Sequence, residues 1–322
     1  MAQNGHWKLN AFGRRLARMS LPLTALVLAG LVGCGNEEGT TSGMVSAEPG
    51  PKALVYATNY PLQYMSMALA GDAAKVQFAE MEGDPAFWQP TADVVAEMQQ
   101  AELIVLNGAD YEPWLGQVTL PSDRLLDTSE GFRDQLIESG GPTHSHGTDG
   151  DHSHGSYAFT AWLDLDLAEA QASAIRDRLA MLLPDADQAL ERNWSSLTTK
   201  LDAWDKRLTE LGARFGDTPV LFSHPVYQYL ERRYGFNGRS LHWEPDSVPP
   251  DAEWAALPAL LSEHPATLMI WEDEPLAETV EGLKALGVES VVFSPMGNRP
   301  ATGDFESGME ANLKSLEGAA PL

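Results

Sequence analysis

The chain has 322 residues, of which 43% are hydrophobic, and its formal net charge at pH 7 is −25. This excess of acidic residues excludes nucleic acid as a partner, because proteins bind phosphate backbones through Lys and Arg. Cys34 is the only cysteine, which excludes an intramolecular disulfide. We interpret the acidity as a solubility feature or an adaptation to salty water, and it also makes the surroundings of the protein mildly attractive to cations.

The N-terminus has the charge and hydropathy pattern of a signal peptide. The first twenty residues include four basic residues and no acidic one, and an apolar run too short to span a bilayer follows at 21–32. The run ends in L-V-G-C, which resembles the lipobox of bacterial lipoproteins and implies cleavage after residue 33 and diacylglycerol on Cys34. The alternative is an ordinary signal peptide followed by an unpaired cysteine. Gly35 and Asn36 follow, and the absence of Asp at these positions resembles sorting to the outer membrane of a two-membrane cell.

Residues 34–51 are rich in Gly, Glu, Ser, Thr and Pro and show no apolar periodicity, which predicts a lipidated flexible tether. About 270 residues remain, a length that suits two lobes better than one core. We predict an N-terminal lobe at 52–186, a linking helix at 187–216 and a C-terminal lobe at 217–322.

Strands and helices alternate in the N-terminal lobe. Strands are predicted at 52–57, 75–79 and 103–106, and helices at 60–70, 90–100 and 167–183. This alternation favours a parallel sheet covered by helices. A segment without apolar residues, 142–156, predicts a solvated loop that contains four histidines, His144, His146, His152 and His154.

The clearest helical pattern in the chain covers residues 187–211. Its apolar residues recur at intervals of four and three: Leu190, Trp194, Leu197, Leu201, Trp204, Leu208 and Leu211. Gly212 and Gly216 are predicted to end this helix. A coiled-coil dimer is the competing interpretation, but the run is short for a coiled coil, and we favour a helix packed along both lobes of one chain.

The alternation resumes beyond this helix and predicts a second α/β lobe. Strands are expected at 219–222, 239–243, 267–271 and 290–293, and helices at 226–234, 252–262, 276–286 and 305–316. The predicted fold class is therefore α/β, with two lobes of parallel sheet covered by helices and joined by one long backbone helix.

Short motifs follow one another in a recognisable order. They are N-Y-P-L at 59–62, D-P at 84–85, Q-P-T-A-D-V at 89–94, W-L-D at 162–164, S-H at 223–224, R-R-Y-G at 232–235 and S-P-M-G at 294–297. Together they resemble the metal-binding lipoproteins of bacterial ABC importers, which are solute receptors for zinc or manganese. The resemblance covers nearly all of 52–316, and a His-rich loop is typical of the zinc-specific members.

The resemblance implies one ion between the lobes, held by three His, or by two His and a carboxylate, plus an acidic residue. Most of these ligands do not carry over. The corresponding positions hold Ala86 (or Phe87, since one residue is deleted nearby), Thr160 and Ser294, and only His224 retains the expected residue type. One imidazole does not hold zinc tightly, because protein zinc sites use three or four ligands. Either the cleft has lost its metal or other residues rebuild the site.

Candidates for a rebuilt metal site follow three strands of the C-terminal lobe. Ligands collect beyond the carboxyl ends of strands in open α/β sheets. His224 follows the first strand, His242 and Glu244 lie at the end of the second, and Glu272 follows the third. A His with one or two carboxylates is a plausible ligand set for zinc or manganese.

Each of these residues has an alternative role. Glu272 is alternatively a solvated loop acid, or it orients His224 by accepting the other ring proton. His242 is alternatively an internally hydrogen-bonded histidine. The resemblance implies a structural role for Glu244, since the family has an acidic residue here that is not a regular ligand.

The four loop histidines form a separate candidate for metal capture. Neutral imidazole is a ligand that zinc accepts, and the pattern H-S-H…H-S-H places four of them on one segment. Ordering a floppy loop costs entropy, so we expect modest affinity. The alternative is a solvated loop without a metal-binding role.

The sequence contains no catalytic motif: it lacks G-x-S-x-G, H-E-x-x-H, a phosphate-binding glycine loop and a second cysteine. We therefore expect a non-enzymatic, monomeric solute-binding lipoprotein in the periplasm or on the cell surface, with an outer membrane slightly favoured. It would bind zinc, or manganese as the second candidate, and deliver the ion to an ABC permease. The alternative is a surface lipoprotein on the same fold that serves metal buffering, adhesion or assembly and binds no ion in its cleft.

Overall fold

A computed structural model describes residues 52–79, 81, 88–139, 144–145, 151–152 and 156–321. The signal peptide, Cys34 and the tether predicted for residues 1–51 lie outside these ranges. None of the helices in the described part of the chain is long and apolar enough to cross a membrane.

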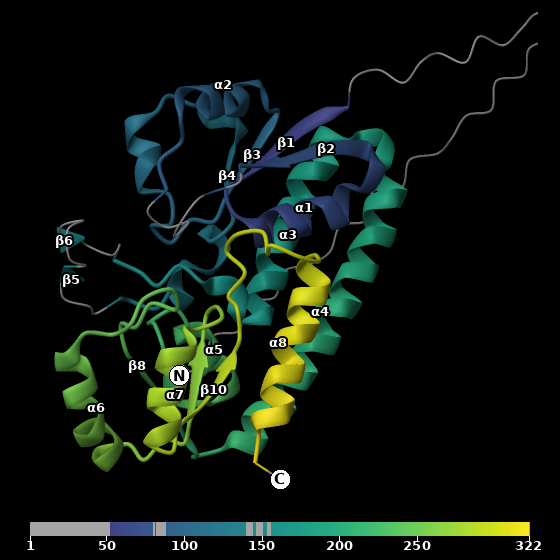
Figure 1. Ribbon diagram of the computed structural model, residues 1–322. Coiled ribbons are helices and arrows are strands. Elements are labelled where there is room, and N and C mark those ends of the chain that lie inside the picture. The colour runs from purple at the N-terminus through teal and green to yellow at the C-terminus, as the bar shows by residue number, and fades with distance from the viewer. Residues whose placement is uncertain are drawn as a thin grey trace, which may run out of the picture. The chain divides into compact units, whose positions relative to one another are not determined.

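The first lobe is built on a four-stranded parallel sheet in the order β2-β1-β3-β4. Its strands are β1 (Ala53–Ala57), β2 (Ala74–Phe78), β3 (Leu103–Leu106) and β4 (Leu125–Asp127). Helices α1 (Tyr60–Ala70) and α3 (Leu165–Leu182) cover one face, and α2 (Ala92–Gln100) covers the other (Figure 1). Because both faces are covered, β3 is an uninterrupted apolar run.

The second lobe has the same architecture, with a parallel sheet in the order β10-β9-β7-β8. Its elements are β7 (Pro219–Phe222), α5 (Gln228–Tyr234), β8 (Asn237–Ser240), α6 (Asp251–Glu263), β9 (Leu268–Trp271), α7 (Ala277–Ala285), β10 (Glu289–Val292) and α8 (Phe305–Ala319). Helices α6 and α7 pack on one face around Leu221 and Met269, while α5 and α8 pack on the other around Phe222 and Ile270. Alternate side chains of β7 and β9 thus enter different core clusters.

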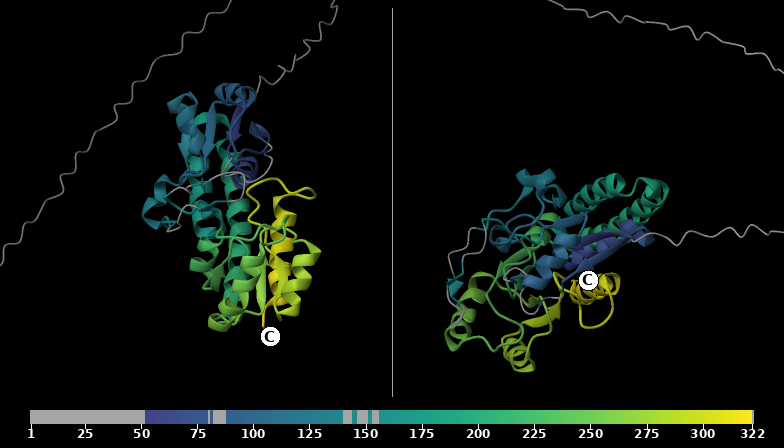
Figure 2. Two further views of the ribbon diagram at one scale, coloured as in Figure 1. Left: turned by 60° about the vertical axis from the view of Figure 1, so that its left-hand side comes forward. Right: turned by 90° about the horizontal axis from the view of Figure 1, so that it is seen from above.

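Helix α4 (Asp187–Phe215) connects the lobes and packs against both. It lies beside α1 and α3 in one lobe and beside α8 in the other (Figure 1), and at 1.5 Å per residue its 29 residues span roughly 43 Å. The left view of Figure 2 shows the purple and blue lobe near one end of the teal helices and the green and yellow lobe near the other.

The periodic leucines of α4 and Trp204 are buried by α1, α3 and α8 of the same chain, and the partly buried Trp194 packs against the same core. They are therefore not available for a coiled-coil dimer. The predicted fold class, two helix-covered parallel sheets joined by one long helix, is confirmed.

Of the two glycines predicted to end the long helix, Gly216 does so and Gly212 does not, because α4 continues through Gly212 to Phe215. A Cβ atom at residue 212 would lie only 1.9 Å from the carbonyl oxygen of Tyr234. This glycine therefore permits the close approach of α4 to the end of α5 and does not terminate the helix. Gly216, with a φ of +50°, is the residue that ends it.

The predicted strand at 239–243 was also displaced, since β8 ends at Ser240. The next residues still run alongside the neighbouring strand: the amide of Leu241 donates to Phe222 O and that of Trp243 donates to Ser223 O, both at 2.8 Å. β8 itself is polar because it is an exposed edge strand. The apolar residues that suggested a strand belong to the irregular extension of β8 beyond Ser240.

Candidate functional site

His224 lies at the carboxyl end of β7, in a loop fixed by backbone hydrogen bonds. The amide of Ser223 donates to Ile270 O at 2.9 Å, and the amide of Val226 donates to His224 O at 2.9 Å. From the other lobe, the Thr160 hydroxyl donates to Val226 O at 2.6 Å. The His224 side chain is 8% exposed, so the ring is held within the protein with little room to reorient.

Glu244 and His242 lie next to His224. The Glu244 Oε1 atom is 3.7 Å from His224 Nε2, and the rings of His224 and His242 are nearly perpendicular with centroids 5.8 Å apart. The cause is the extension of β8 alongside β7. Trp243 enters the core cluster under α6, so its sequence neighbours on both sides point toward His224. Three of the four predicted cleft residues are therefore adjacent.

Glu272 follows β9 and is half-buried. It lies near Tyr227, whose hydroxyl donates to Phe293 O at 2.7 Å. Burial and, second, the negative charge of Glu272 raise the pKa of Tyr227 well above its ordinary value.

In the part of the chain that the structure describes, no group of three or more His, Cys, Asp or Glu side chains is arranged to hold a metal ion.

Two positions where the family resemblance implies ligands have hydrogen-bonding roles instead. The Thr160 hydroxyl is bonded to Val226 O, as described above. The backbone of Ser294 is held by Asn312 of α8: the Ser294 amide donates to Asn312 Oδ1 at 2.8 Å, and Asn312 Nδ2 donates to Ser294 O at 2.7 Å. Ala86 lies outside the described residues.

The loops at the carboxyl ends of the two sheets bond directly to each other. Trp162 Nε1 donates to Pro295 O at 2.7 Å, and the amide of Tyr60 donates to Gly297 O at 3.0 Å. A side-chain bond of 3.1 Å joins Arg299 to Gln63. The two lobes therefore meet through specific bonds close to the candidate metal residues.

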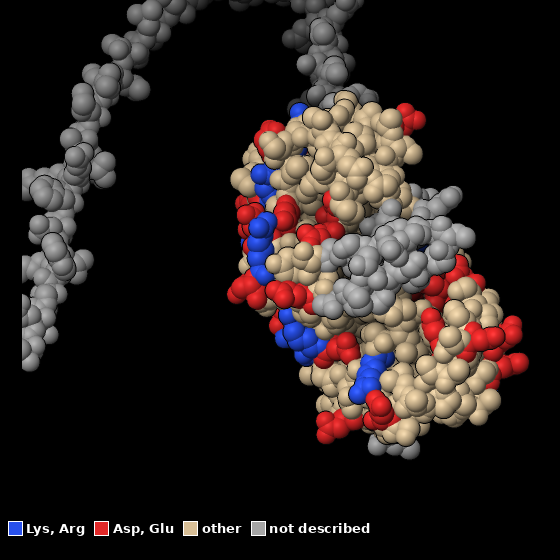
Figure 3. Space-filling view, turned by 90° about the vertical axis from the view of Figure 1, so that its left-hand side faces the viewer, with Lys and Arg blue, Asp and Glu red and all other residues tan. Residues whose placement is uncertain are grey.

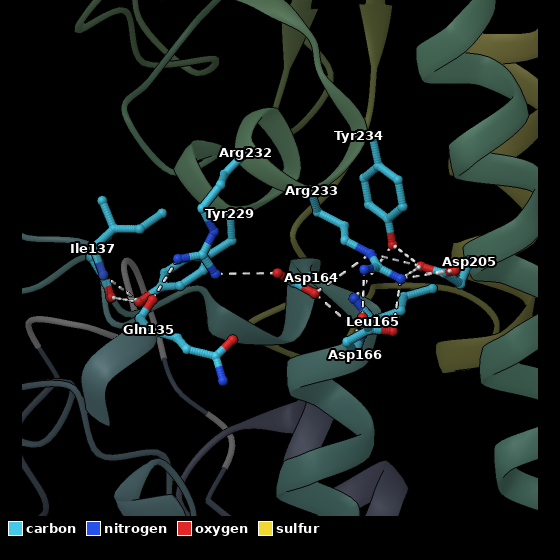
Figure 4. A network of polar contacts seen from close by, with 11 residues as sticks. Gln135, Ile137, Asp164, Leu165, Asp166, Asp205, Tyr229, Arg232, Arg233 and Tyr234 are labelled. Atoms are coloured by element: carbon cyan, nitrogen blue, oxygen red, sulfur yellow. Dashed lines mark hydrogen bonds and ion pairs between the residues drawn. The ribbon is translucent and has the colours of Figure 1, made fainter. Parts of the chain in front are cut away.

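An ionic network fixes α5, the helix that follows the His224 loop (Figure 4). Arg232 Nη2 lies 3.2 Å from Asp164 Oδ2, and Arg233 Nη2 lies 3.1 Å from Asp205 Oδ1 on α4. Arg233 also pairs with Asp166, and the Tyr234 hydroxyl donates to Asp205 at 3.0 Å. The network ties α5 to the start of α3 and to the long helix.

A buried carboxyl group that the sequence did not indicate lies at the carboxyl end of the first sheet. Glu112 accepts hydrogen bonds from the Thr58 hydroxyl at 2.6 Å and from the amides of Asn107 and Gly108 at 2.7 and 3.1 Å. Burial raises the pKa of Glu112 to about 7, although these hydrogen bonds oppose the shift. The signal in the sequence is the N-G turn after β3, followed by Asp110 and Glu112 in a stretch that also contains aromatic residues.

The histidine-rich segment is described only in part. His144–Ser145 (β5) and Asp151–His152 (β6) pair antiparallel, with His144 opposite His152. The base of the segment is closed by a bridge between Glu138 and Tyr157. His146 and His154 lie outside the described residues.

Comparison with known proteins gives a family for the chain. A family model described as zinc-uptake complex component A, periplasmic (ZnuA), matches residues 55–319. A relative, the zinc-binding lipoprotein AdcA of Streptococcus pneumoniae, is 26% identical over 317 residues; the alignment covers 94% of this chain but 61% of AdcA, so the chain spans about three fifths of that protein's length. The high-affinity zinc uptake system protein ZnuA of Bacillus subtilis is 24% identical over 278 residues, covering 82% of this chain and 83% of the relative.

A solved structure is similar to the whole two-lobed body. The crystal structure of the Zn(II)-bound ZnuA-like domain of S. pneumoniae AdcA matches with a TM-score of 0.72 at 24% identity, covering 84% of this chain and 100% of that domain. This likeness establishes the fold, and the family model covers most of the chain. The protein therefore belongs to the ZnuA family of periplasmic zinc-uptake components.

Proposed function

We propose that this protein is the solute-binding lipoprotein of a metal ABC importer, which captures zinc, or manganese as the second candidate, and delivers it to a membrane permease. The observation that carries the proposal is the pair formed by His224 and Glu244 at the carboxyl end of the second sheet. Family membership supports it, as do relatives named zinc-uptake and manganese-transport proteins. The family is not an enzyme family.

The distance between the two donor atoms suits a shared ion. Two ligands of a tetrahedral zinc ion, each at about 2.0–2.1 Å from the metal, are roughly 3.3 Å apart. His224 Nε2 and Glu244 Oε1 are 3.7 Å apart, and the Glu244 side chain is 41% exposed and can shift by a few tenths of an ångström. We assign His224 as the fixed ligand and Glu244 as the mobile one.

His242 and Glu272 have supporting roles in this proposal. The perpendicular ring of His242, 5.8 Å from that of His224 between centroids, offers a second imidazole beside the ion. Glu272, near Tyr227, adds negative charge at the end of the neighbouring strand. The histidines of the loop would capture ions from solution but would not hold the transported ion. They are His144, His146, His152 and His154.

The location of the protein follows the same reasoning. Relatives are named lipoproteins, which supports an extracytoplasmic protein anchored to a membrane. We propose that the anchor is diacylglycerol on Cys34 and that residues 34–51 form the tether. The lobe boundaries proposed from the sequence, 52–186 and 217–322 with a linking helix at 187–216, suit this arrangement.

Zinc affinity measured by competition with a chromophoric chelator tests the proposal. We expect His224→Ala to weaken binding about 100-fold, or ~3 kcal/mol, and Glu244→Gln about tenfold. Glu274→Gln, an exposed acid on the loop after β9, is the matched control and should leave the affinity unchanged. If zinc binding is lost only when residues 143–155 are deleted, the loop holds the metal. If neither the wild type nor any variant binds zinc, the alternative of a surface lipoprotein without an ion is favoured.

A further inference from the structure

Strand β8 is an edge of the second sheet, and its extension lengthens that edge. Among the described strands, only β7 pairs with β8. The amides of Leu241 and Trp243 still donate toward β7. Because backbone groups alternate in direction along a strand, the N–H and C=O groups of Gly238 and Ser240 point to the open side. Residues 237–243 therefore present an edge to which a further extended segment can bond.

The side chains of β8 leave this edge accessible. Edge strands are commonly shielded by charged side chains, by proline or by a covering loop. β8 has the sequence N-G-R-S, and its one charged residue, Arg239, pairs with Glu263 of α6 at 3.5 Å. The other side chains of β8 are small and uncharged, so they do not screen the backbone.

A hollow of about 300 Å³ adjoins the edge on the side of α6, between that helix and the extension of β8. Its walls are mainly apolar and include Leu241, Trp243, Leu257 and Leu260. Ser240 belongs to β8 and also lines the hollow, so the hollow opens beside the edge. An apolar side chain from an added strand would find a place here, away from water.

The carboxylate of Glu231 flanks the same edge on the side of α5. A Cβ atom added to Gly238 would lie 2.3 Å from Glu231 Oε1, so this carboxylate lies over β8. Among the described residues, no hydrogen bond or ion pair reaches it. The nearby arginines are engaged elsewhere: Arg232 and Arg233 pair with aspartates at the start of α3 and on α4, and Arg239 pairs with α6. Burial raises the pKa of Glu231 to about 7.

These two flanks select different side chains on one extended segment. Neighbouring residues of a strand point to opposite faces, so an added strand would send alternate side chains toward the hollow and toward Glu231. The hollow favours an apolar side chain, and the carboxylate favours Lys or Arg. Glu253, which lines the hollow, and the acidic side chains on the lower, C-terminal lobe in Figure 3 favour a basic segment as well.

We infer that the β8 edge and the adjacent hollow form a docking site for an extended segment of another protein, which alternates apolar and basic residues and adds to the four-stranded sheet as a further strand. Main-chain hydrogen bonds to residues 237–243 provide affinity, and the hollow and Glu231 provide specificity. The inference does not depend on the proposed metal site, because neither His224 nor Glu244 takes part in it.

Synthetic peptides test the docking site on the full chain purified in detergent. The probe is K-L-K-V-K-L-K, and the control, K-K-L-V-L-K-K, has the same composition and charge without the alternation. Fluorescence anisotropy of labelled peptide measures affinity, and hydrogen exchange measures protection of residues 237–243. We expect the probe to bind about tenfold more tightly than the control and to slow exchange at the edge.

Matched substitutions localise the binding. Ser240→Pro removes an outward N–H group at an edge position, where proline is tolerated, and should weaken binding of the probe about tenfold, whereas Ser240→Ala should not. Ala256 lines the hollow and its neighbour Ala255 does not, although both are exposed. Ala256→Trp should weaken binding by a similar factor, and Ala255→Trp should leave it unchanged. If Ser240→Pro does not fold, the two alanine variants decide.

The role of Glu231 is tested by the pH dependence of the affinity. A lysine of the bound probe favours the ionised carboxylate, so binding releases a proton to solvent when Glu231 is protonated beforehand. The ionised fraction of a group with a pKa of about 7 rises about tenfold from pH 6 to pH 8. The affinity of the wild type should rise by about the same factor, and that of Glu231→Gln should stay nearly level.

Several results would overturn the inference. They are equal affinities for the probe and the control, unchanged affinity in folded Ser240→Pro and Ala256→Trp, and the same pH profile in wild type and Glu231→Gln. A wild-type dimer that Ser240→Pro separates, measured by sedimentation, would instead assign the edge to a second copy of the chain. Tighter probe binding after deletion of residues 143–155 would assign it to a segment of the chain itself.

Discussion

The position of His224 is set by its backbone and by the opposite lobe. The amide of Ser223 bonds to β9, and the carbonyl of Val226 accepts a hydrogen bond from Thr160 across the lobes. The ring is therefore held in place before any ion arrives, and the entropy cost of ordering this ligand is met during folding. Glu244 is the more exposed donor of the pair, with 41% of its side chain exposed against 8% for His224.

At Glu112, the raised pKa predicts a pH-dependent stability. A carboxyl group whose pKa is about 7 in the folded protein and near 4.5 in the unfolded chain binds its proton more tightly when folded. Its stabilising contribution is complete below pH 4.5 and is lost as the pH rises through 7. The shift corresponds to about 3 kcal/mol between these limits.

Urea unfolding of wild type and Glu112→Gln at pH 5, 6, 7 and 8 measures this contribution. We expect the free energy of unfolding to fall less steeply with pH in the variant, because the titrating group is gone. Glu130→Gln, a substitution of an exposed acid, should keep the wild-type slope. Equal slopes in wild type and Glu112→Gln would show that Glu112 keeps the same charge over this range.

Asp164 serves two purposes at the start of α3. Its side chain caps the helix by accepting from the amide of Asp166 at 3.2 Å, and it also pairs with Arg232. We expect Asp164→Ala to lower the free energy of unfolding by about 2 kcal/mol, through loss of the cap and of a mostly buried ionic partner. Asp164→Asn, which keeps the cap, should cost less. Chemical denaturation compares them, and equal effects would assign the whole loss to the charge.

At the scale of elements, Gly212 tests the packing of α4 on α5. Alanine normally stabilises a helix relative to glycine by about 0.5–1 kcal/mol. At residue 212 the added Cβ would lie 1.9 Å from Tyr234 O, so Gly212→Ala should instead destabilise the protein by about 1–3 kcal/mol. Gly318 in α8 has nothing within 4 Å of an added Cβ, so Gly318→Ala should stabilise it. Thermal unfolding measures both changes, and a stabilised Gly212→Ala variant would contradict the packing.

The elements with strong periodicity could be predicted from the sequence, and the others could not. β3 and α1 have the predicted bounds because each has a clear apolar pattern between turn residues. β4 was not predicted, since it is only three residues long and half-buried. β8 was misplaced because an exposed edge strand carries polar residues and its extension carries the apolar ones. In both cases the sheet partner, which the local sequence does not contain, determines the strand.

At the scale of the whole molecule, the two lobes share one core. Residues of both sheets and of α4 belong to one apolar cluster, and direct bonds such as that from Trp162 to Pro295 join the loops. A wide opening between the lobes would expose this shared core to water, at about 25 cal/mol for each square ångström of apolar surface. We therefore expect binding and release to involve small tilts and local loop movement.

The candidate site could be predicted in part, because strand order alone brings some of its residues together. Parallel strands end at one edge of the sheet, so the nearness of His224, His242 and Glu244 follows from strand order. The other features of the site depend on tertiary contacts that the local sequence does not show. The sequence did not indicate that Thr160 and Ser294 form hydrogen bonds with the loop after His224 and with α8, or that Glu112 is buried. Nor did it indicate a hollow beside His242, which depends on the distance between α6 and the β8 extension.

The most direct test of the central claim is anomalous diffraction at the zinc edge from crystals of the zinc-loaded protein. We predict one ion bound about 2.0–2.1 Å from His224 Nε2, with a carboxylate oxygen of Glu244 in its coordination shell. The same measurement on His224→Ala should show no ion at this position. Zinc bound only to the segment 142–156, or a wild-type crystal with no anomalous peak beside His224, would contradict the proposal that the second lobe holds the transported ion.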